Sequence, residues 1–276
     1  MKPPCLFVLR GGSFSAPAAL LRAGAASLAI AMVFGGNLAF AGVIGVSDDT
    51  WVREDSPTSN RNGDDFMNAR TDSDADDNDV ILLGFDLSAK NGPAAMTTLN
   101  LTWYRSDGST GKTLSLYGLN DLSPNETTWS ESSVVYNDAP GLVPDGQDPV
   151  TEIGLGRSDA DVHDLDTANL TLLVADQPYG PQVEGDLYTF ASSALDDFLN
   201  ADTNGQATFL IVRNSDPSSN QARFIQKEAM AFASGAAVGA GGAGAFLGNV
   251  PVVPEPASAV LIVLSGLAVG MLRRRS

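Results

Sequence analysis

The chain has 276 residues, a formal net charge of −17 and a single cysteine, Cys5. A surface this acidic repels nucleic acid and anionic lipid, so the composition excludes a nucleic-acid-binding protein. One cysteine and one histidine, His163, also exclude a disulfide framework and a metal centre built on several cysteines or histidines.

The N-terminal stretch has the pattern of a secretory signal peptide. A basic leader is followed by an apolar run over residues 23–40, and the small residues Ala39 and Ala41 precede Gly42. A small-x-small ending after an apolar run is typical of a signal-peptidase cleavage site. We therefore predict a signal peptide at residues 1–41, cleaved between Ala41 and Gly42. An uncleaved N-terminal anchor is the alternative.

From residue 42 to about residue 230, short β-type runs alternate with loops rich in Gly, Pro, Asn and Asp. The predicted strands cover residues 43–46, 50–53, 66–70, 80–87, 99–105, 112–117, 134–136, 151–154, 170–175, 187–190, 208–213 and 223–226. No alternation of strands with helices is present, which disfavours a nucleotide-binding α/β domain.

Three of these segments carry more specific information. Residues 80–87 are apolar throughout, which is typical of a strand covered on both faces. Residues 99–105 alternate clearly and, with residues 112–117, predict a hairpin. Residues 193–200 form the one predicted soluble helix, with Ser192 or Ser193 as its cap. The sequence thus predicts an all-β, antiparallel β-sandwich of jelly-roll type with one short helix in domain 42–230.

The segment 231–252 is rich in glycine and alanine, and we interpret it as a linker with a possible last strand at residues 245–249.

The C-terminal tail, residues 253–276, has three features in order. A Pro-Glu-Pro step is followed by an apolar run at 257–272, which predicts a transmembrane helix of roughly 24 Å, and then by three arginines. This order resembles the PEP-CTERM sorting signal of Gram-negative bacteria. The resemblance implies transient residence in the inner membrane, recognition by an exosortase-type processing protease, removal of the tail, and delivery to the cell surface or extracellular matrix. A plain C-terminal anchor is the alternative. The predicted signal residues are Val253, Pro254, Glu255, Pro256, Arg273, Arg274 and Arg275.

Four segments of the domain, at residues 48–53, 80–88, 125–140 and 207–229, together resemble the DNRLRE-domain family. The resemblance implies a jelly-roll sandwich akin to carbohydrate-binding modules, without catalytic activity, that in some cases binds a polysaccharide such as alginate. Members often carry a basic residue in the long apolar strand, where this chain has Leu83 and Gly84.

Closely spaced carboxylates provide candidate ligands for Ca²⁺, which prefers six to eight oxygen ligands. Asp72, Asp74 and Asp76 lie in a run that resembles the start of an EF-hand loop, although a solvated acidic loop is the alternative. Asp48 and Asp49 at an early strand are a second candidate for a structural calcium site.

Two aromatic residues are candidates for stacking on a sugar ring. Tyr104 falls on the polar face of its strand, whereas Trp103 is in phase with Leu99 and Leu101 and is assigned to the core. Trp129 lies in a polar loop, where it either contacts glycan or anchors the loop to the sandwich.

No catalytic constellation is evident, since two aspartates beside His163 do not make a triad. We therefore expect an exported, non-enzymatic protein of the cell surface or extracellular matrix that binds glycan or has a structural part in exopolysaccharide. A polysaccharide-active enzyme, lyase or hydrolase, is the alternative from another class.

Overall fold

The computed structural model describes residues 40–71, 78–108, 110–143, 165–213, 221–238 and 244–252. Backbone contacts divide the chain into Met1–Leu38 and Ala39–Ser276, and all described residues belong to the second unit. The predicted transmembrane helix, the sorting signal and the predicted strand 151–154 lie outside the described residues, as do Ala39, Asp72, Asp74, Asp76 and His163. Among the described residues, no helix is long and apolar enough to cross a membrane.

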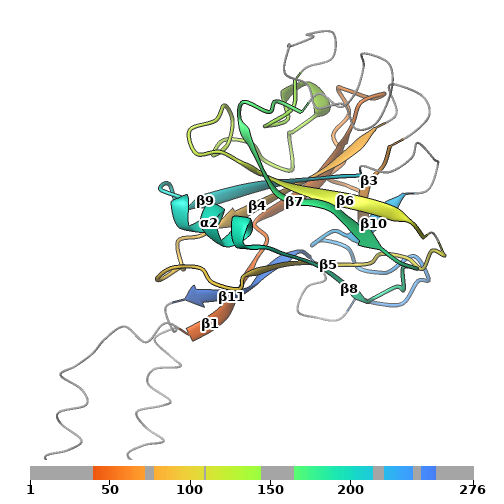
Figure 1. Ribbon diagram of the computed structural model, residues 1–276. Helices are drawn as coiled ribbons and strands as arrows, with labels where there is room; N and C mark the ends of the chain where they lie inside the picture. Colours follow the sequence, from red (N-terminus) through yellow and green to blue (C-terminus); the bar gives the residue numbers. More distant parts are fainter. Residues whose placement is uncertain are drawn as a thin grey trace, which may run out of the picture. The chain divides into compact units, whose positions relative to one another are not determined.

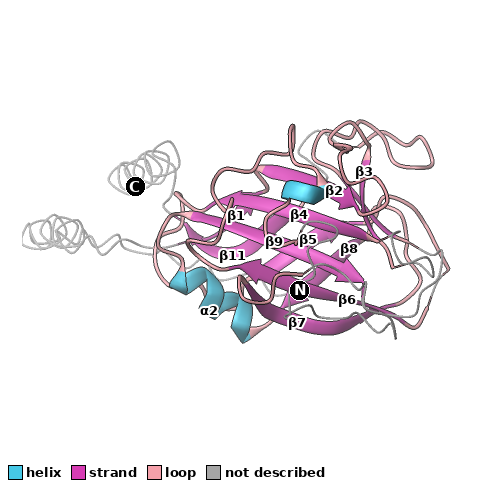
Figure 2. Cartoon of the chain, turned by 90° about the horizontal axis from the view of Figure 1, so that it is seen from above, coloured by secondary structure: helices cyan, strands magenta, loops and turns pink. Residues whose placement is uncertain are grey.

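The second unit is built mainly of antiparallel strands in two large sheets and one small sheet (Figures 1 and 2). The four-stranded sheet has the order β1 (Phe40–Gly45), β11 (Phe246–Val252), β5 (Thr98–Thr102) and β8 (Leu187–Ala191). The five-stranded sheet has the order β2 (Asp48–Arg53), β4 (Asp79–Asp86), β9 (Gln206–Arg213), β6 (Lys112–Leu119) and β7 (Leu170–Tyr179). The small sheet pairs β3 (Phe66–Ala69) with β10 (Ala222–Ile225). The predicted antiparallel β-sandwich is confirmed.

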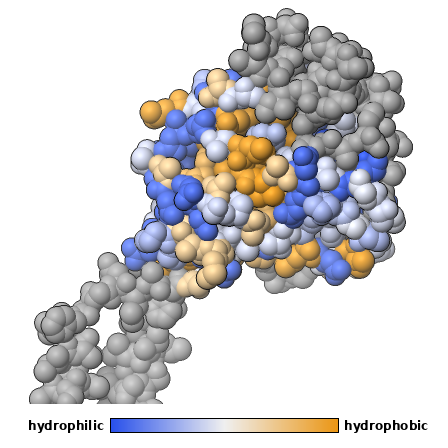
Figure 3. All heavy atoms as spheres, in the orientation of Figure 1, coloured by the Kyte–Doolittle hydropathy of each residue, from blue (hydrophilic) through white to orange (hydrophobic). Residues whose placement is uncertain are grey.

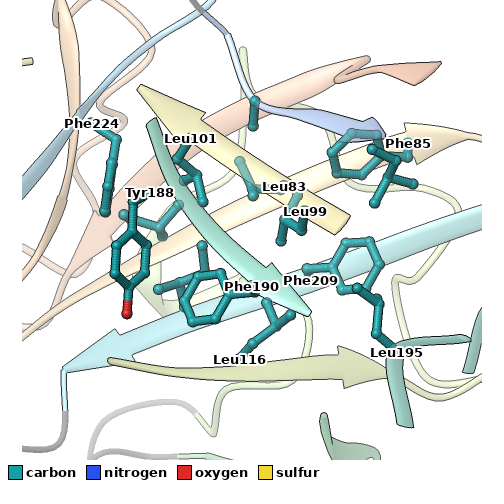
Figure 4. Close-up of a cluster of buried hydrophobic side chains, with 14 of the residues drawn as sticks. Leu83, Phe85, Leu99, Leu101, Leu116, Tyr188, Phe190, Leu195, Phe209 and Phe224 are labelled. Carbon is teal, nitrogen blue, oxygen red and sulfur yellow. The ribbon is translucent and has the colours of Figure 1, made fainter. Parts of the chain in front are cut away.

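The main core lies between the two large sheets. Successive side chains of a strand point to opposite faces, so Leu83 and Phe85 of β4 face the core together with Phe209 of β9. They meet Leu99 and Phe190 from the four-stranded sheet, and Figure 4 shows these side chains interleaved. Each large apolar side chain buried there contributes roughly 1.5–3 kcal/mol of hydrophobic free energy.

The opposite face of the five-stranded sheet is buried as well. Leu82 of β4 and Leu210 of β9 are fully buried in a second cluster, which is closed by loop residues such as Val134 and Tyr136. The sequence-based prediction that residues 80–87 are covered on both faces is therefore confirmed. The predicted strand at 134–136 is wrong, because this cover is a loop with a 3₁₀ turn, η1 (Tyr136–Asp138).

The predicted hairpin of residues 99–105 with 112–117 is also wrong. β5 pairs with β11 and β8, whereas β6 pairs with β9 and β7 in the other sheet. Alternation determined which side chains share a face of each strand, but it carries no information on which strand lies next to it. The chain crosses from one sheet to the other between these two strands.

The predicted helix is present as α2 (Ser193–Ala201). The Ser192 Oγ accepts a hydrogen bond of 3.0 Å from the Leu195 N–H, as expected of an N-cap, and donates one of 2.8 Å to the Leu173 carbonyl of β7. The Tyr188 hydroxyl donates to the Gln177 carbonyl, also on β7, at 3.0 Å. These two side chains satisfy carbonyls of the edge strand and so protect that edge from further pairing.

β1 and β11 bring the first and last described segments together, with Phe40 opposite Val252. The predicted last strand at 245–249 is β11, which extends to Val252. The predicted cleavage site between Ala41 and Gly42 lies inside β1, so cleavage there would remove the first two residues of this strand.

We predict that Ser192→Ala lowers the free energy of unfolding by about 1–2 kcal/mol, because it removes both the helix cap and the hydrogen bond to β7. Urea unfolding measures the difference. Ser193→Ala is the matched control, since its exposed side chain makes neither contact. Equal stability of the two variants would contradict this role of Ser192.

Candidate glycan-binding surface and acidic cluster

An aromatic row crosses one end of the sandwich. Trp51 of β2 stacks on Phe66 of β3 with ring centroids 6.1 Å apart, and Phe66 contacts Tyr104 at 5.1 Å. Trp51 is buried in the main core, while Phe66 and Tyr104 are half-buried. Tyr104, predicted as a glycan contact, is thus one of the two accessible members of this row.

Two guanidinium groups stack on rings of this row. The Arg61 Cζ lies 4.9 Å from the centroid of the Trp51 ring, and the Arg223 Cζ lies 4.4 Å from that of Phe66. Such cation–π contacts hold a guanidinium flat and leave its edge directed away from the ring. We refer to Arg61, Phe66, Tyr104, Arg105 and Arg223 as the arginine–aromatic surface.

Two arginines of this surface, Arg105 and Arg223, are close enough to repel one another. Burial lowers the pKa of Arg223, and the nearby charges of Arg105 and Arg70 lower it further, against an opposing effect of Asp79. Arg105 has Asp107 as an ionic partner at 3.3 Å. Among the described residues, Arg61 and Arg223 form no ion pair with a carboxylate.

The Nε–H groups of Arg61, Arg105 and Arg223 are buried and find no hydrogen-bond acceptor among the described residues. A buried donor without a partner costs roughly 1–3 kcal/mol. An anion bound at this end would relieve the repulsion between the Arg105 and Arg223 guanidinium groups. The arrangement is therefore suited to a carboxylate or sulfate.

Trp129, the other predicted glycan contact, lies elsewhere, on the outer cover of the five-stranded sheet. Its Nε1–H donates a hydrogen bond to the Thr208 Oγ1 at 2.9 Å. Its ring packs against Gly84, where an added Cβ atom would lie only 3.1 Å from the ring. The absence of a side chain at Gly84 makes room for this ring. Trp129 also borders a polar hollow of about 270 Å³ with Asn125 and Asp138, but its main contacts anchor the loop.

Three carboxylates lie together close to the arginine–aromatic surface. One of them belongs to Asp49, two residues before Trp51 on β2. Asp49, Glu131 and Glu228 place one oxygen each within 4.8 Å of one another, and we call them the acidic cluster. The Lys227 ammonium lies among them, 3.7 Å from Asp49 Oδ1 and 2.7 Å from Glu228 Oε1, and it is also bonded to Glu131.

Backbone and amide hydrogen bonds hold the acidic cluster in place. The Asp49 N–H donates to Glu131 Oε2 at 2.9 Å, and the Lys227 N–H donates to Asp49 Oδ2 at 2.9 Å. The Gln226 amide donates to the Asp49 carbonyl at 2.7 Å. The cluster consequently joins β2, the loop at Glu131 and the turn after β10.

Burial dominates the electrostatics of Asp49. It raises the pKa of this carboxyl from 3.8 to about 7, although Lys227 acts in the opposite direction. Burial also disfavours the charge of Lys227, but Glu131 and Glu228 outweigh it and raise the pKa of the ammonium. Three carboxylates and one ammonium leave an excess of negative charge at this place.

The oxygens of the acidic cluster fit a hard divalent cation. Asp49 Oδ1 and Gln226 Oε1 are buried and accept no hydrogen bond among the described residues. Carboxylate and amide oxygens are ligands that Ca²⁺ prefers. A cation there would compete with the Lys227 ammonium for the same oxygens.

The structure brings only some of the predicted ligands together. Asp49 belongs to the acidic cluster, whereas Asp48 instead accepts a 3.4 Å hydrogen bond from the Glu131 N–H. Sequence reasoning missed Glu131, Glu228 and Arg223. They are distant from β2 and β3 in sequence, and no local spacing distinguishes them from the other charged residues.

Residues 43–167 match the model of carbohydrate-binding module family 96. The match begins in β1, ends before β7 and covers less than half of the chain. No curated protein matches the chain.

The region that matches carbohydrate-binding module family 96 includes Phe66 and Tyr104 of the surface, and Asp49 and Glu131 of the cluster. Arg223 lies beyond it. The match thus indicates a carbohydrate-binding domain in this part of the chain, completed in space by strands that follow residue 167.

We predict that the stability contributed by Asp49 falls as the pH rises. The folded state holds the proton up to about pH 7, whereas the unfolded state releases it near 3.8, so unfolding becomes easier between these values. The loss amounts to at most about 4 kcal/mol. Asp49→Asn should remove it in urea unfolding series across this range, and Asp48→Asn should not. An unchanged pH profile in Asp49→Asn would contradict the prediction.

Proposed function

We propose that the protein is an exported, non-catalytic polysaccharide-binding protein, and that its arginine–aromatic surface binds an anionic glycan. The observation that carries the proposal is the stacking of the Arg61 and Arg223 guanidinium groups on Trp51 and Phe66, without an ion pair to any described carboxylate. The half-buried Tyr104 lies beside them, and Arg61 and Tyr104 fall within the residues that match carbohydrate-binding module family 96. Bidentate contacts between a guanidinium group and a carboxylate are strong and geometrically specific. A uronate chain presents such carboxylates along its length.

The acidic net charge does not oppose this proposal at short range. Charges separated by more than about 8–10 Å are largely screened at physiological ionic strength, so the groups next to the ligand decide the affinity. At the arginine–aromatic surface the guanidinium groups of Arg61 and Arg223 form no ion pair with a described carboxylate, while Asp65 and Glu184 lie near Tyr104. The distant carboxylates chiefly slow the approach of a polyanion.

In the proposed function the protein is exported from the cell. The predicted leader, the tail at residues 253–276 and the resemblance of this tail to the PEP-CTERM signal support export, processing by an exosortase-type protease and residence at the cell surface or in the extracellular matrix. A polysaccharide ligand would be met in that compartment.

The strand order supports a jelly-roll type of sandwich within this proposal. The order β1-β11-β5-β8 stands opposite β4-β9-β6-β7, with consecutive strands crossing repeatedly between the sheets, and β2 adds an edge strand beside β4. Jelly rolls occur in lectin-type domains, where binding surfaces lie on loops and sheet ends.

The proposal also places a structural Ca²⁺ at the acidic cluster. The buried Asp49 Oδ1, which accepts no hydrogen bond among the described residues, supports it, and a cation would lower the pKa of that carboxyl by stabilising its ionised form. The ion would fasten β2 to the turn after β10, next to Arg223. Binding requires the Lys227 ammonium to leave the cluster.

We predict that Arg223→Gln weakens binding to sodium alginate about tenfold or more, because a guanidinium–carboxylate contact contributes roughly 1.5–3 kcal/mol. Affinity electrophoresis of the exported domain in dilute sodium alginate gels measures the effect, run once with EDTA and once with a calcium concentration too low to gel alginate. Arg223→Lys should retain part of the affinity.

Lys90→Gln is the matched control, since Lys90 follows the opposite end of β4 and its side chain makes no described hydrogen bond or ion pair. Lack of retardation of the wild-type protein by alginate, or equal losses in Arg223→Gln and Lys90→Gln, would refute an anionic ligand at this surface.

We predict that Lys227→Met lowers the melting temperature without calcium and enlarges the calcium-induced rise, because it removes the cation that neutralises the cluster. Ligand at 100 times Kd adds about 2.7 kcal/mol, which corresponds to a rise of several degrees. Thermal unfolding with EDTA and with added CaCl₂ tests this. A melting temperature that does not respond to calcium in either protein would exclude the ion.

A further inference from the structure

A second hollow, separate from the arginine–aromatic surface, lies between α2 and the ends of β6 and β7. Its volume is about 580 Å³, within the range of small-molecule sites, and Phe198, Asp197 and Asp121 contribute to its lining. We call it the α2 pocket. Figure 1 draws β7 and α2 on the side turned to the viewer, and Figure 3 shows on the same side an apolar patch bordered by hydrophilic side chains.

The floor of the α2 pocket is a fixed aromatic ring. Phe198 is half-buried and contacts Phe209 at 5.5 Å between centroids. Its ring lies so close to Gly118 that a Cβ there would be 2.6 Å from it. A ring held in this way offers an apolar surface without losing conformational freedom on binding, as the apolar face of a pyranose requires.

The rim of the α2 pocket offers hydrogen-bond acceptors at fixed positions. Asp121 Oδ2 accepts hydrogen bonds from the Thr203 N–H at 2.8 Å and the Thr203 hydroxyl at 2.6 Å. Asn120 Oδ1 accepts from the Thr171 hydroxyl at 2.5 Å. Asp197 is exposed and forms no hydrogen bond or ion pair with another described residue, so its carboxylate is available to a ligand.

Every charge at the α2 pocket is negative. Its lining includes the carboxylates of Asp121 and Asp197 and no lysine, arginine or histidine. Ala201, at the C-terminal end of α2, also lines it, and the last turn of this helix carries no basic residue. The partial negative charge of a helix C-terminus is favourable to a cation, and here no described side chain supplies one.

The turn beside the α2 pocket contains an unusual residue. Leu122 follows Asp121, is 91% exposed and has φ = 68°, in a turn closed by a 3.1 Å hydrogen bond from the Ser123 N–H to the Asn120 carbonyl. This position of a turn normally takes glycine or asparagine, because other side chains are strained there. The chain thus holds an apolar side chain in solvent at a conformational cost, next to the pocket.

From these observations we infer that the α2 pocket binds an unacetylated amino-sugar unit of a glycan. The pyranose would stack on Phe198, its hydroxyls would donate to Asn120 and Asp121, and its ammonium would pair with Asp197. The inference rests on the proposed function in taking the ligand to be a glycan, but the site and its charge preference are the reverse of those at the arginine–aromatic surface.

The two sites would contact different parts of a matrix. β9 begins five residues after α2 ends and runs for eight residues, or roughly 24 Å, to Arg213. The Arg213 carbonyl accepts a hydrogen bond from Thr71, which follows Arg70 near the arginine–aromatic surface. A protein with one site for acidic and one for basic sugars would link polysaccharides of opposite charge.

Titration of the full exported domain with a glucosamine disaccharide, followed by NMR chemical shifts, tests the inference. In mildly acidic buffer we expect shifts centred on Ala201 and Asp197, and little response to the N-acetylated disaccharide, which has the same ring but no charge. An aliphatic diamine controls for simple ion exchange. Equal binding of the acetylated sugar or of the diamine would overturn the inference.

Two variants test whether the sugar binds at the α2 pocket or responds only to the overall negative charge of the protein surface. Asp197→Asn should weaken glucosamine disaccharide binding about fivefold, as expected for one exposed ion pair, while Asp186→Asn, an exposed carboxylate in the loop between β7 and β8, should not. Equal weakening by both would overturn the inference.

Leu122→Gly should raise the melting temperature by about 2–4 °C, because glycine adopts a positive φ without strain. The same variant should weaken glucosamine disaccharide binding. Unchanged binding would show that Leu122 does not belong to the site.

These experiments distinguish failure of the α2 pocket from failure of the proposed function. Loss of amino-sugar binding with alginate binding intact would overturn only the α2 pocket. Amino-sugar binding that persists in Arg223→Gln supports two separate sites, whereas its loss in that variant would contradict them.

Discussion

The burial of both faces of β4 and β9 is the constraint on which the rest of the structure depends. One face meets the four-stranded sheet and the other meets the loop cover around Tyr136, so almost every side chain of these two strands is enclosed. A sheet enclosed on both faces cannot offer a flat platform to a sugar chain. On this sheet, binding is thereby restricted to the ends and edges, where strands stop and loops begin. Both candidate sites lie in such places.

At the β3–β10 end, tertiary structure reverses the electrostatic character of the chain. The molecule as a whole is strongly acidic, yet arginines from separate segments converge on two aromatic rings. Stacking keeps their guanidinium planes in place, and their mutual repulsion leaves them suited to an anion. The nearby acidic cluster has the opposite character, and its balance depends on whether Lys227 or a divalent cation occupies the space between its oxygens. In the proposed function, fold stability and ligand binding at this end are therefore coupled through β2.

The proposed function depends on the separation of positively and negatively charged side chains between two places on the molecule. The arginine–aromatic surface and the α2 pocket lie toward opposite ends of β9; the first brings guanidinium groups onto aromatic rings, and the second brings carboxylates beside Phe198. The long-range field of the protein is negative, but ligands respond mainly to groups within about one Debye length. An acidic protein can in this way hold a polyanion at one place and an amine-bearing sugar at another.

The sequence by itself determined the periodicities and therefore the elements. Alternation and full burial identified β4, β9 and α2, with Ser192 or Ser193 as its cap, because these signals depend on neighbours one to four residues away. The sequence also indicated Tyr104 and Asp49 as residues of interest. Only the tertiary structure decided the pairing of β5 with β11 instead of β6, and the assembly of Arg61 with Arg223 or of Asp49 with Glu131 and Glu228. Contacts across 80 or more residues depend on which strands become neighbours, and strand periodicity does not encode that choice.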